Sequence, residues 1–341
     1  MIASIWFYAL TIFPCFLYLY GFNQVNSFLR QSEDVFNRHE IRLHAVKRSI
    51  IFFAFATLAL ALMSIIQAPE KFLNYIFTWH LLHLFAFSTL YLLLIWEISR
   101  WFERKNRVSL NHQQIISILL LISLISIIAL FIFFHDYTVM IQESNSREFP
   151  VSLEILSILK NISFDVSSCG LIPWLSFPLA GGFTASFLNL NRDSQNHVMQ
   201  KSKLLLLANF LLLIIGFLYL ENERFISAGL GYASSFSHVF ISIGLNGCIF
   251  ILLVLILDIH QIIPHKTSYN LLYPIIIVSK ISLTVYYVHP VVGVIDPSLI
   301  PSESVLLVFV SLYSLFFVLL AHFWQKWDFK FSFEWIVRNY S

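Results

Sequence analysis

Several ionisable side chains of this chain lie within or beside long apolar stretches, where they could do chemistry. His80 and His83 are three residues apart, which places both on one face of a helix. Lys280 and His289 are nine residues apart in a later stretch, about 13 Å along a helix. His238 begins a third stretch. An imidazole can act as a general base near neutral pH, and an ammonium can hold a phosphate group.

Each of these residues also has a structural interpretation. His80 and His83 could bond neighbouring helices, and because no third ligand accompanies them we expect no metal site. Lys280 could instead extend its ammonium to the inner lipid headgroups. Asn246 lies two turns deeper than His238, and a polar group at that depth needs a bonding partner or a wet cavity.

The elements that must position these residues follow from the composition. The 341 residues are 58% hydrophobic and only 12% charged, whereas soluble proteins carry roughly 25% charged residues. The net charge of +2 offers no basic excess for nucleic acid. The composition predicts an all-α polytopic membrane protein, since each spanning helix needs about 20 apolar residues. Nine stretches meet that requirement: Ala3–Phe22, Ser49–Ile66, Phe72–Trp96, Ile115–Phe134, Gly170–Leu190, Leu204–Leu220, Phe236–Leu257, Leu271–His289 and Val305–Trp324.

The distribution of basic residues predicts the orientation of these spans. Sixteen of the 21 Lys and Arg residues lie in alternate connections: Arg30–Arg48, Arg100–Arg107, Arg192–Lys203, Asp258–Tyr269 and the tail after Trp324. By the positive-inside rule these segments are cytoplasmic. We therefore expect a single membrane domain over residues 1–341, with the C-terminus inside the cell and the N-terminus outside.

Four segments resemble motifs of one family. The family is the transmembrane acyltransferase superfamily, particularly its heparan-alpha-glucosaminide N-acetyltransferase-like branch and the bacterial relatives of that branch. The segments are residues 11–23 (TIFPCFLYLYGFN, like FPxFLFLxG), 171–182 (LIPWLSFPLAGG, like PWLGxFLxG), 279–289 (SKISLTVYYVH, like G-[RKM]-x-S-L-x-x-Y-x-x-H) and 331–338 (FSFEWIVR, like GPLEWxxR). The basic pair before the second predicted span also matches the family.

The resemblance implies an enzyme that moves an acyl group from cytosolic acyl-CoA, acetyl-CoA in the namesake, to a hydroxyl or amine on the far side. Acyl-CoA would be a substrate, and no resident cofactor is expected. The implied catalytic residues are His289 as general base, with Tyr286 and Ser282. The implied donor-binding residues are Lys280, Arg48 and Lys47. Glu334 and Arg338, in the last motif, are expected to be structural.

One departure from the family leaves alternatives open. Family members have a further helix before the FPxFLFLxG segment, which would give ten spans and an N-terminus inside. Without that helix the chain could be an inactive relative. A transporter or flippase for a small solute or lipid-linked sugar would also use buried ionisable residues. The expected partners are the lipid bilayer, in a bacterial inner membrane, and a glycan or lipid-linked acceptor. A homodimer is compatible with the sequence.

Overall fold

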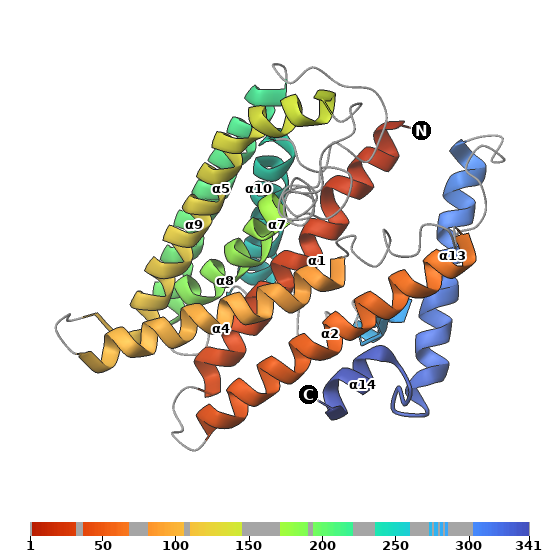
Figure 1. The fold of residues 1–341 in the computed structure, drawn as a ribbon, viewed down its shortest axis with the longest axis horizontal. Helices are drawn as coiled ribbons and strands as arrows, with labels where there is room; N and C mark the ends of the chain where they lie inside the picture. Colours follow the sequence, from red (N-terminus) through yellow and green to blue (C-terminus); the bar gives the residue numbers. More distant parts are fainter. Residues whose placement is uncertain are drawn as a thin grey trace. The chain divides into compact units, whose positions relative to one another are not determined.

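The computed structural model describes residues 2–31, 37–67, 81–105, 110–144, 171–189, 194–220, 236–259 and 303–340, with short pieces between 273 and 285 (Figure 1). All regular structure in these residues is helical, as the composition predicts. Five helical stretches are long and apolar enough to cross a membrane: Leu82–Lys105, His112–Ile132, Leu171–Leu188, Gln195–Tyr219 and Ser237–Leu257. These stretches are consistent with an integral membrane protein.

The chain divides into two compact units, and the larger comprises residues 3–255. Its elements are α1 (Ile2–Gln31), α2 (Asn37–Gln67), α4 (Leu81–Lys105), α5 (His112–Ser144), α7 (Leu171–Trp174), α8 (Ser176–Leu188), α9 (Gln195–Leu220), α10 (Phe236–Leu253) and the π-helical turn η3 (Val254–Ile259), which crosses the boundary between the units. Helix α9 packs along α10, α2 along α4, and α5 against α8. The outer faces stay apolar, as lipid contact requires. On α9 the exposed apolar residues include Leu204, Leu207, Phe210 and Leu218.

Helices α1 and α8 cross with their backbones in contact. A Cβ atom on Gly21 would overlap the main chain of Pro178, and one on Gly181 would overlap the carbonyl of Tyr18. Small residues at such crossings allow close packing of helices in lipid. Beside the crossing, the Tyr18 hydroxyl lies 2.6 Å from Thr184 Oγ1. Two of the family-like segments, residues 11–23 and 171–182, are therefore packed against each other.

Several helices run beyond the apolar stretches that predicted them. The basic segment Arg30–Arg48 was expected to connect two spans, but α1 continues to Gln31 and α2 begins at Asn37. Arg48 therefore lies three turns inside a continuous helix. The aliphatic part of a Lys or Arg side chain can cover apolar surface while its charged group reaches polar surroundings. Such residues can therefore extend a helix beyond its apolar stretch.

The smaller unit consists mainly of residues 256–341, and its helices are α13 (Glu303–Gln325) and α14 (Phe333–Tyr340). Ile277, Ile281 and Ala321 form a small buried cluster there. Glu334 accepts hydrogen bonds from the backbone N–H of Thr284, at 3.1 Å, and from its hydroxyl, at 2.6 Å. These bonds join the family-like segments 279–289 and 331–338.

Candidate functional site

The predicted catalytic residues and one member of the histidine pair lie outside the described residues. They are His289, Tyr286, Ser282 and His80. Lys280 is described, in the smaller unit, where its side chain is exposed and its Nζ lies 5.7 Å from the centre of the Phe329 ring. The other predicted candidates all lie in the larger unit, which can be considered by itself.

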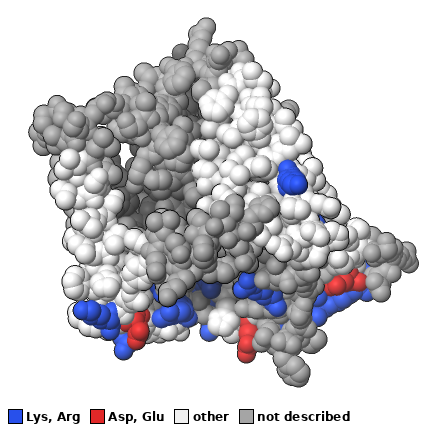
Figure 2. All heavy atoms as spheres, turned by 180° about the vertical axis from the view of Figure 1, so that it is seen from behind, with Lys and Arg blue, Asp and Glu red and all other residues white. Residues whose placement is uncertain are grey.

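One end of the larger unit carries its charged side chains, and we call it the basic end. Helices α1, α4 and α8 finish there, and α2, α5 and α9 begin there. Hydrogen bonds hold these helix ends together: Gln113, near the start of α5, donates to the carbonyl of Ser186 at 2.6 Å and accepts from Asn189 at 2.5 Å. On the face that Figure 2 shows, most of the described surface carries no Lys, Arg, Asp or Glu side chain.

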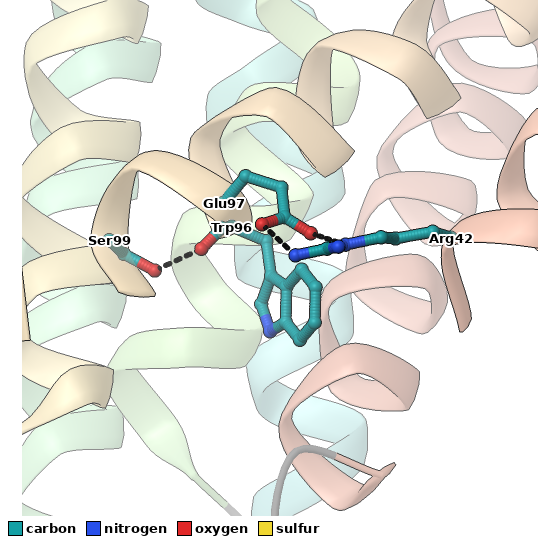
Figure 3. A network of polar contacts seen from close by, with 4 residues as sticks. All are labelled: Arg42, Trp96, Glu97 and Ser99. Atoms are coloured by element: carbon teal, nitrogen blue, oxygen red, sulfur yellow. Dashed lines mark hydrogen bonds and ion pairs between the residues drawn. The ribbon is translucent and has the colours of Figure 1, made fainter. Parts of the chain in front are cut away.

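Arg42 and Glu97 form a two-bond ion pair at the basic end, joining α2 to α4 (Figure 3). The second bond, from Nη2 to Oε2, is 2.7 Å long. The hydrogen bond with Glu97 raises the pKa of the Arg42 guanidinium. Because 46% and 31% of the two side chains are exposed, this charge is neutralised at the surface and is a poor candidate for ligand binding.

A buried serine–histidine contact lies next to this ion pair. Ser99 donates its only hydroxyl proton to the carbonyl of Trp96, at 2.6 Å (Figure 3). The Ser99 oxygen can then only accept from His112 Nε2, at 2.8 Å, which places a proton on that ring nitrogen. His112 is thereby held as a structural link between α4 and α5. Sequence reasoning missed His112, because this residue lies in a polar segment before an apolar run.

Arg48 is a cation with no carboxylate partner among the residues that the structure describes. Its Nη1 donates to Gln24 Oε1 at 3.1 Å, and Gln24 is only 6% exposed. The Arg48 Nε is buried and has no hydrogen-bond partner among the described side chains and backbone groups. The ion pairs found in the described part of the chain, Arg42–Glu97 and Arg100–Glu103, do not include Arg48. Its neighbour Lys47 is exposed.

The position of Gln24 shows how deep the Arg48 guanidinium lies. Gln24 is three residues after Gly21, where α1 crosses α8, so the two are roughly 4.5 Å apart along the helix axis. From Gln24 to Gln31, the last residue of α1, the helix continues for about 10 Å. A cation this far from the basic end is costly in a membrane, and such residues usually face a cavity or a charged ligand.

Two of the polar candidates from the sequence have structural partners. His83 is 4% exposed, its Nε2 lies 3.4 Å from Thr57 Oγ1, and its ring packs on Phe53. The Asn246 amide donates to the Ser242 carbonyl one turn earlier in α10, at 2.9 Å. Both arrangements satisfy polar groups inside the helix bundle.

His238 is in a different environment, at the opposite end from the basic end. Its ring centroid lies 6.0 Å from that of Trp174 and 6.2 Å from that of Phe177. The span that holds these rings is broken between α7 and α8, and Ile172 has extended backbone angles (φ −109°, ψ 119°). The indole N–H of Trp174 and the hydroxyl of Ser176 are buried and have no hydrogen-bond partner in the described part of the chain.

The described residues thus contain two polar centres, Arg48 with Gln24 and the group around Trp174. The sequence indicated the first through its basic pair but gave no way to tell Arg48 from Lys47. It indicated only His238 of the second. No group of His, Cys, Asp or Glu side chains in the described ranges could hold a metal ion.

Comparison with known proteins identifies no relative whose site could be compared with these two polar centres. No family model, curated protein or solved structure matches the chain.

Proposed function

We propose that this chain is a membrane-bound acyltransferase that uses cytosolic acyl-CoA, with acetyl-CoA as the expected donor. In this proposal all nine predicted stretches cross a bacterial inner membrane, and the basic end faces the cytoplasm. The acceptor is a hydroxyl or amine of a cell-envelope glycan or a lipid-linked sugar. The support is the resemblance of four segments to the family and the pairwise packing of those segments.

The observation that carries the proposal is the Arg48 guanidinium. A partly buried cation with one neutral hydrogen-bond partner gains most from an anionic ligand, and guanidinium binds phosphate through two parallel bonds. The phosphates of acyl-CoA are such a ligand, and they would enter from the basic end. Lys47, exposed beside it, would add only screened attraction.

In the proposed chemical step His289 acts as the general base, as the family resemblance implies. The acceptor oxygen or nitrogen attacks the thioester carbonyl, and His289 takes the proton that this atom loses. The carbon–sulfur bond breaks, and the CoA thiolate leaves and is protonated. Tyr286 and Ser282, on the same motif, would orient the acceptor or the thioester oxygen. Lys280 would attract the donor phosphates.

The first test is CoA binding by the purified full-length chain in lipid nanodiscs, measured by isothermal calorimetry. Removing a charge-assisted hydrogen bond costs about 1.5–3 kcal/mol, so Arg48→Gln should weaken binding roughly 10- to 100-fold. The matched control is Lys47→Gln, which removes one charge from the adjacent residue and should change the Kd less than about threefold. Equal effects of the two variants would remove Arg48 from the site.

The second test is acetyl transfer from acetyl-CoA to glucose or glucosamine by the same nanodiscs, followed as CoA release. His289→Ala should lower the rate by at least about 100-fold, the contribution expected of a general base. If the wild-type chain binds CoA but the variant loses no activity, the base is a different residue.

A transporter is the second candidate, and the break between α7 and α8 favours it. Broken helices at membrane depth form the solute sites of many secondary transporters. A transporter would move labelled sugar across a liposome membrane without acyl-CoA. Flux that occurs without the donor, together with no CoA release when the donor is present, would favour this candidate over the acyltransferase.

A further inference from the structure

The break between α7 and α8 leaves polar groups that the packing of the bundle does not use. Trp174 is 4% exposed and Ser176 is fully buried, yet within the described ranges the indole N–H and the serine hydroxyl have no hydrogen-bond partner. A serine in a helix usually returns its proton to the carbonyl four residues earlier. Here that residue is Ile172, whose extended backbone departs from the helix, so the usual acceptor is displaced. Each orphaned donor costs about 1–3 kcal/mol.

Aromatic rings pack together at the same place. Trp174 and Phe177 pack edge to face with ring centroids 5.5 Å apart, and the His238 ring lies within 6.2 Å of both. His238 is the third residue of α10 and Trp174 the fourth of α7. The group therefore lies near the helix ends opposite the basic end, on the side that the charge distribution assigns to the cell exterior.

The distance to the Arg48 centre is short. Trp174 precedes Pro178 by four residues, and Gln24 follows Gly21 by three. Because Pro178 and Gly21 are in contact, the two centres are on the order of 10 Å apart along the bundle axis. A ligand at Trp174 would thus lie within reach of a group delivered past Arg48.

We propose that Trp174, Ser176 and His238 form a binding site for a neutral sugar ring. The apolar face of a sugar packs on an indole ring, and its hydroxyl oxygens accept hydrogen bonds from the indole N–H and from Ser176. A ligand with hydroxyl oxygens and an apolar face would accept hydrogen bonds from both orphaned donors and pack against the aromatic rings. The site as such does not depend on acyl transfer. Its role as the acceptor site rests on the proposed function.

The test is saturation-transfer-difference NMR on the full chain in lipid nanodiscs prepared without sugar detergents, with no acyl-CoA present. The probes are glucose and N-acetylglucosamine. We expect saturation of the ring C–H protons in the wild-type chain. Trp174→Phe keeps an aromatic ring and removes the N–H, and Ser176→Ala removes the hydroxyl. Each should weaken binding about fivefold, the equivalent of one neutral hydrogen bond.

The matched control is Trp101→Phe, which alters an indole that is 52% exposed near the basic end and should leave binding unchanged. Wild-type binding that persists unaltered in both Trp174→Phe and Ser176→Ala would overturn the assignment. So would the absence of saturation transfer from either sugar to a wild-type chain that is correctly folded. Because the donor is left out, failure here is separate from failure of CoA binding or acetyl transfer.

Discussion

The hydrogen bond between Tyr18 and Thr184 should respond asymmetrically to substitution of its two partners. Both residues are buried, at 1% and 2% exposure, and their oxygens are 2.6 Å apart. Thr184 donates its single hydroxyl proton to the carbonyl of Ala180, at 3.0 Å. Tyr18 must therefore be the donor in the bond between them.

This direction sets the magnitudes. Thr184→Val keeps the shape but leaves the Tyr18 hydroxyl as a buried donor without an acceptor, which should cost about 1–3 kcal/mol. Tyr18→Phe leaves Thr184 still bonded to Ala180 and should cost only about 0.5–1.5 kcal/mol. In the double variant no donor is orphaned, so its cost should be close to that of Tyr18→Phe alone.

The assay is reversible unfolding in mixed detergent micelles, with the free energy of unfolding measured for the four proteins of the cycle. Tyr91→Phe is a control on α4, where the tyrosine is only partly buried, and it should change stability little. If Tyr18→Phe costs more than Thr184→Val, or if the double variant costs the sum of the two, the assigned direction of the bond is wrong.

Two other contacts can be tested in the same assay. Gly247→Ala would place a methyl group against the Asn209 side chain on α9 and should cost about 1–3 kcal/mol, and adding Asn209→Ala should recover part of that loss because the obstacle is a side chain. Glu97→Gln should cost less than about 1 kcal/mol and less still at high salt, because the pair with Arg42 is partly exposed. Because the pair raises the pKa of Arg42, its contribution to the free energy of unfolding is fully present below the ordinary pKa of arginine. The effect of Glu97→Gln on stability should therefore be constant between about pH 6 and 9. A change in that effect across this pH range would contradict the assignment.

The helical membrane class could be predicted from composition, because a chain this poor in charge has few other ways to satisfy its backbone. The ends of the helices could not. In α2 the residues from Arg38 to Arg48 have the polarity of a connection between spans, yet they continue the helix. The polarity of a residue indicates its surroundings. It does not indicate whether the backbone hydrogen bonds of a helix continue through that residue.

For the candidate site, too, some features could be predicted from the sequence and others could not. A basic pair before an apolar stretch indicates a cationic site, but successive residues on a helix point about 100° apart. Which of Lys47 and Arg48 turns inward therefore depends on where α1 packs. The hydrogen bond between Tyr18 and Thr184 is still harder to predict from the sequence, since the two residues are separated by 166 positions in the chain. The orphaned donors near Trp174 appear only once the helix break is seen.

The crossing of α1 and α8 differs in kind from the contact between Gly247 and Asn209. At Gly247 the obstacle is a side chain, which another mutation can shorten. At Gly21 the obstacle is the main chain of Pro178, which every amino acid carries. A second substitution cannot make room for a side chain at Gly21. In the evolution of this gene the contact between Gly247 and Asn209 can therefore be replaced by another pair of side chains. The glycine at position 21 must be kept for as long as α1 and α8 cross there.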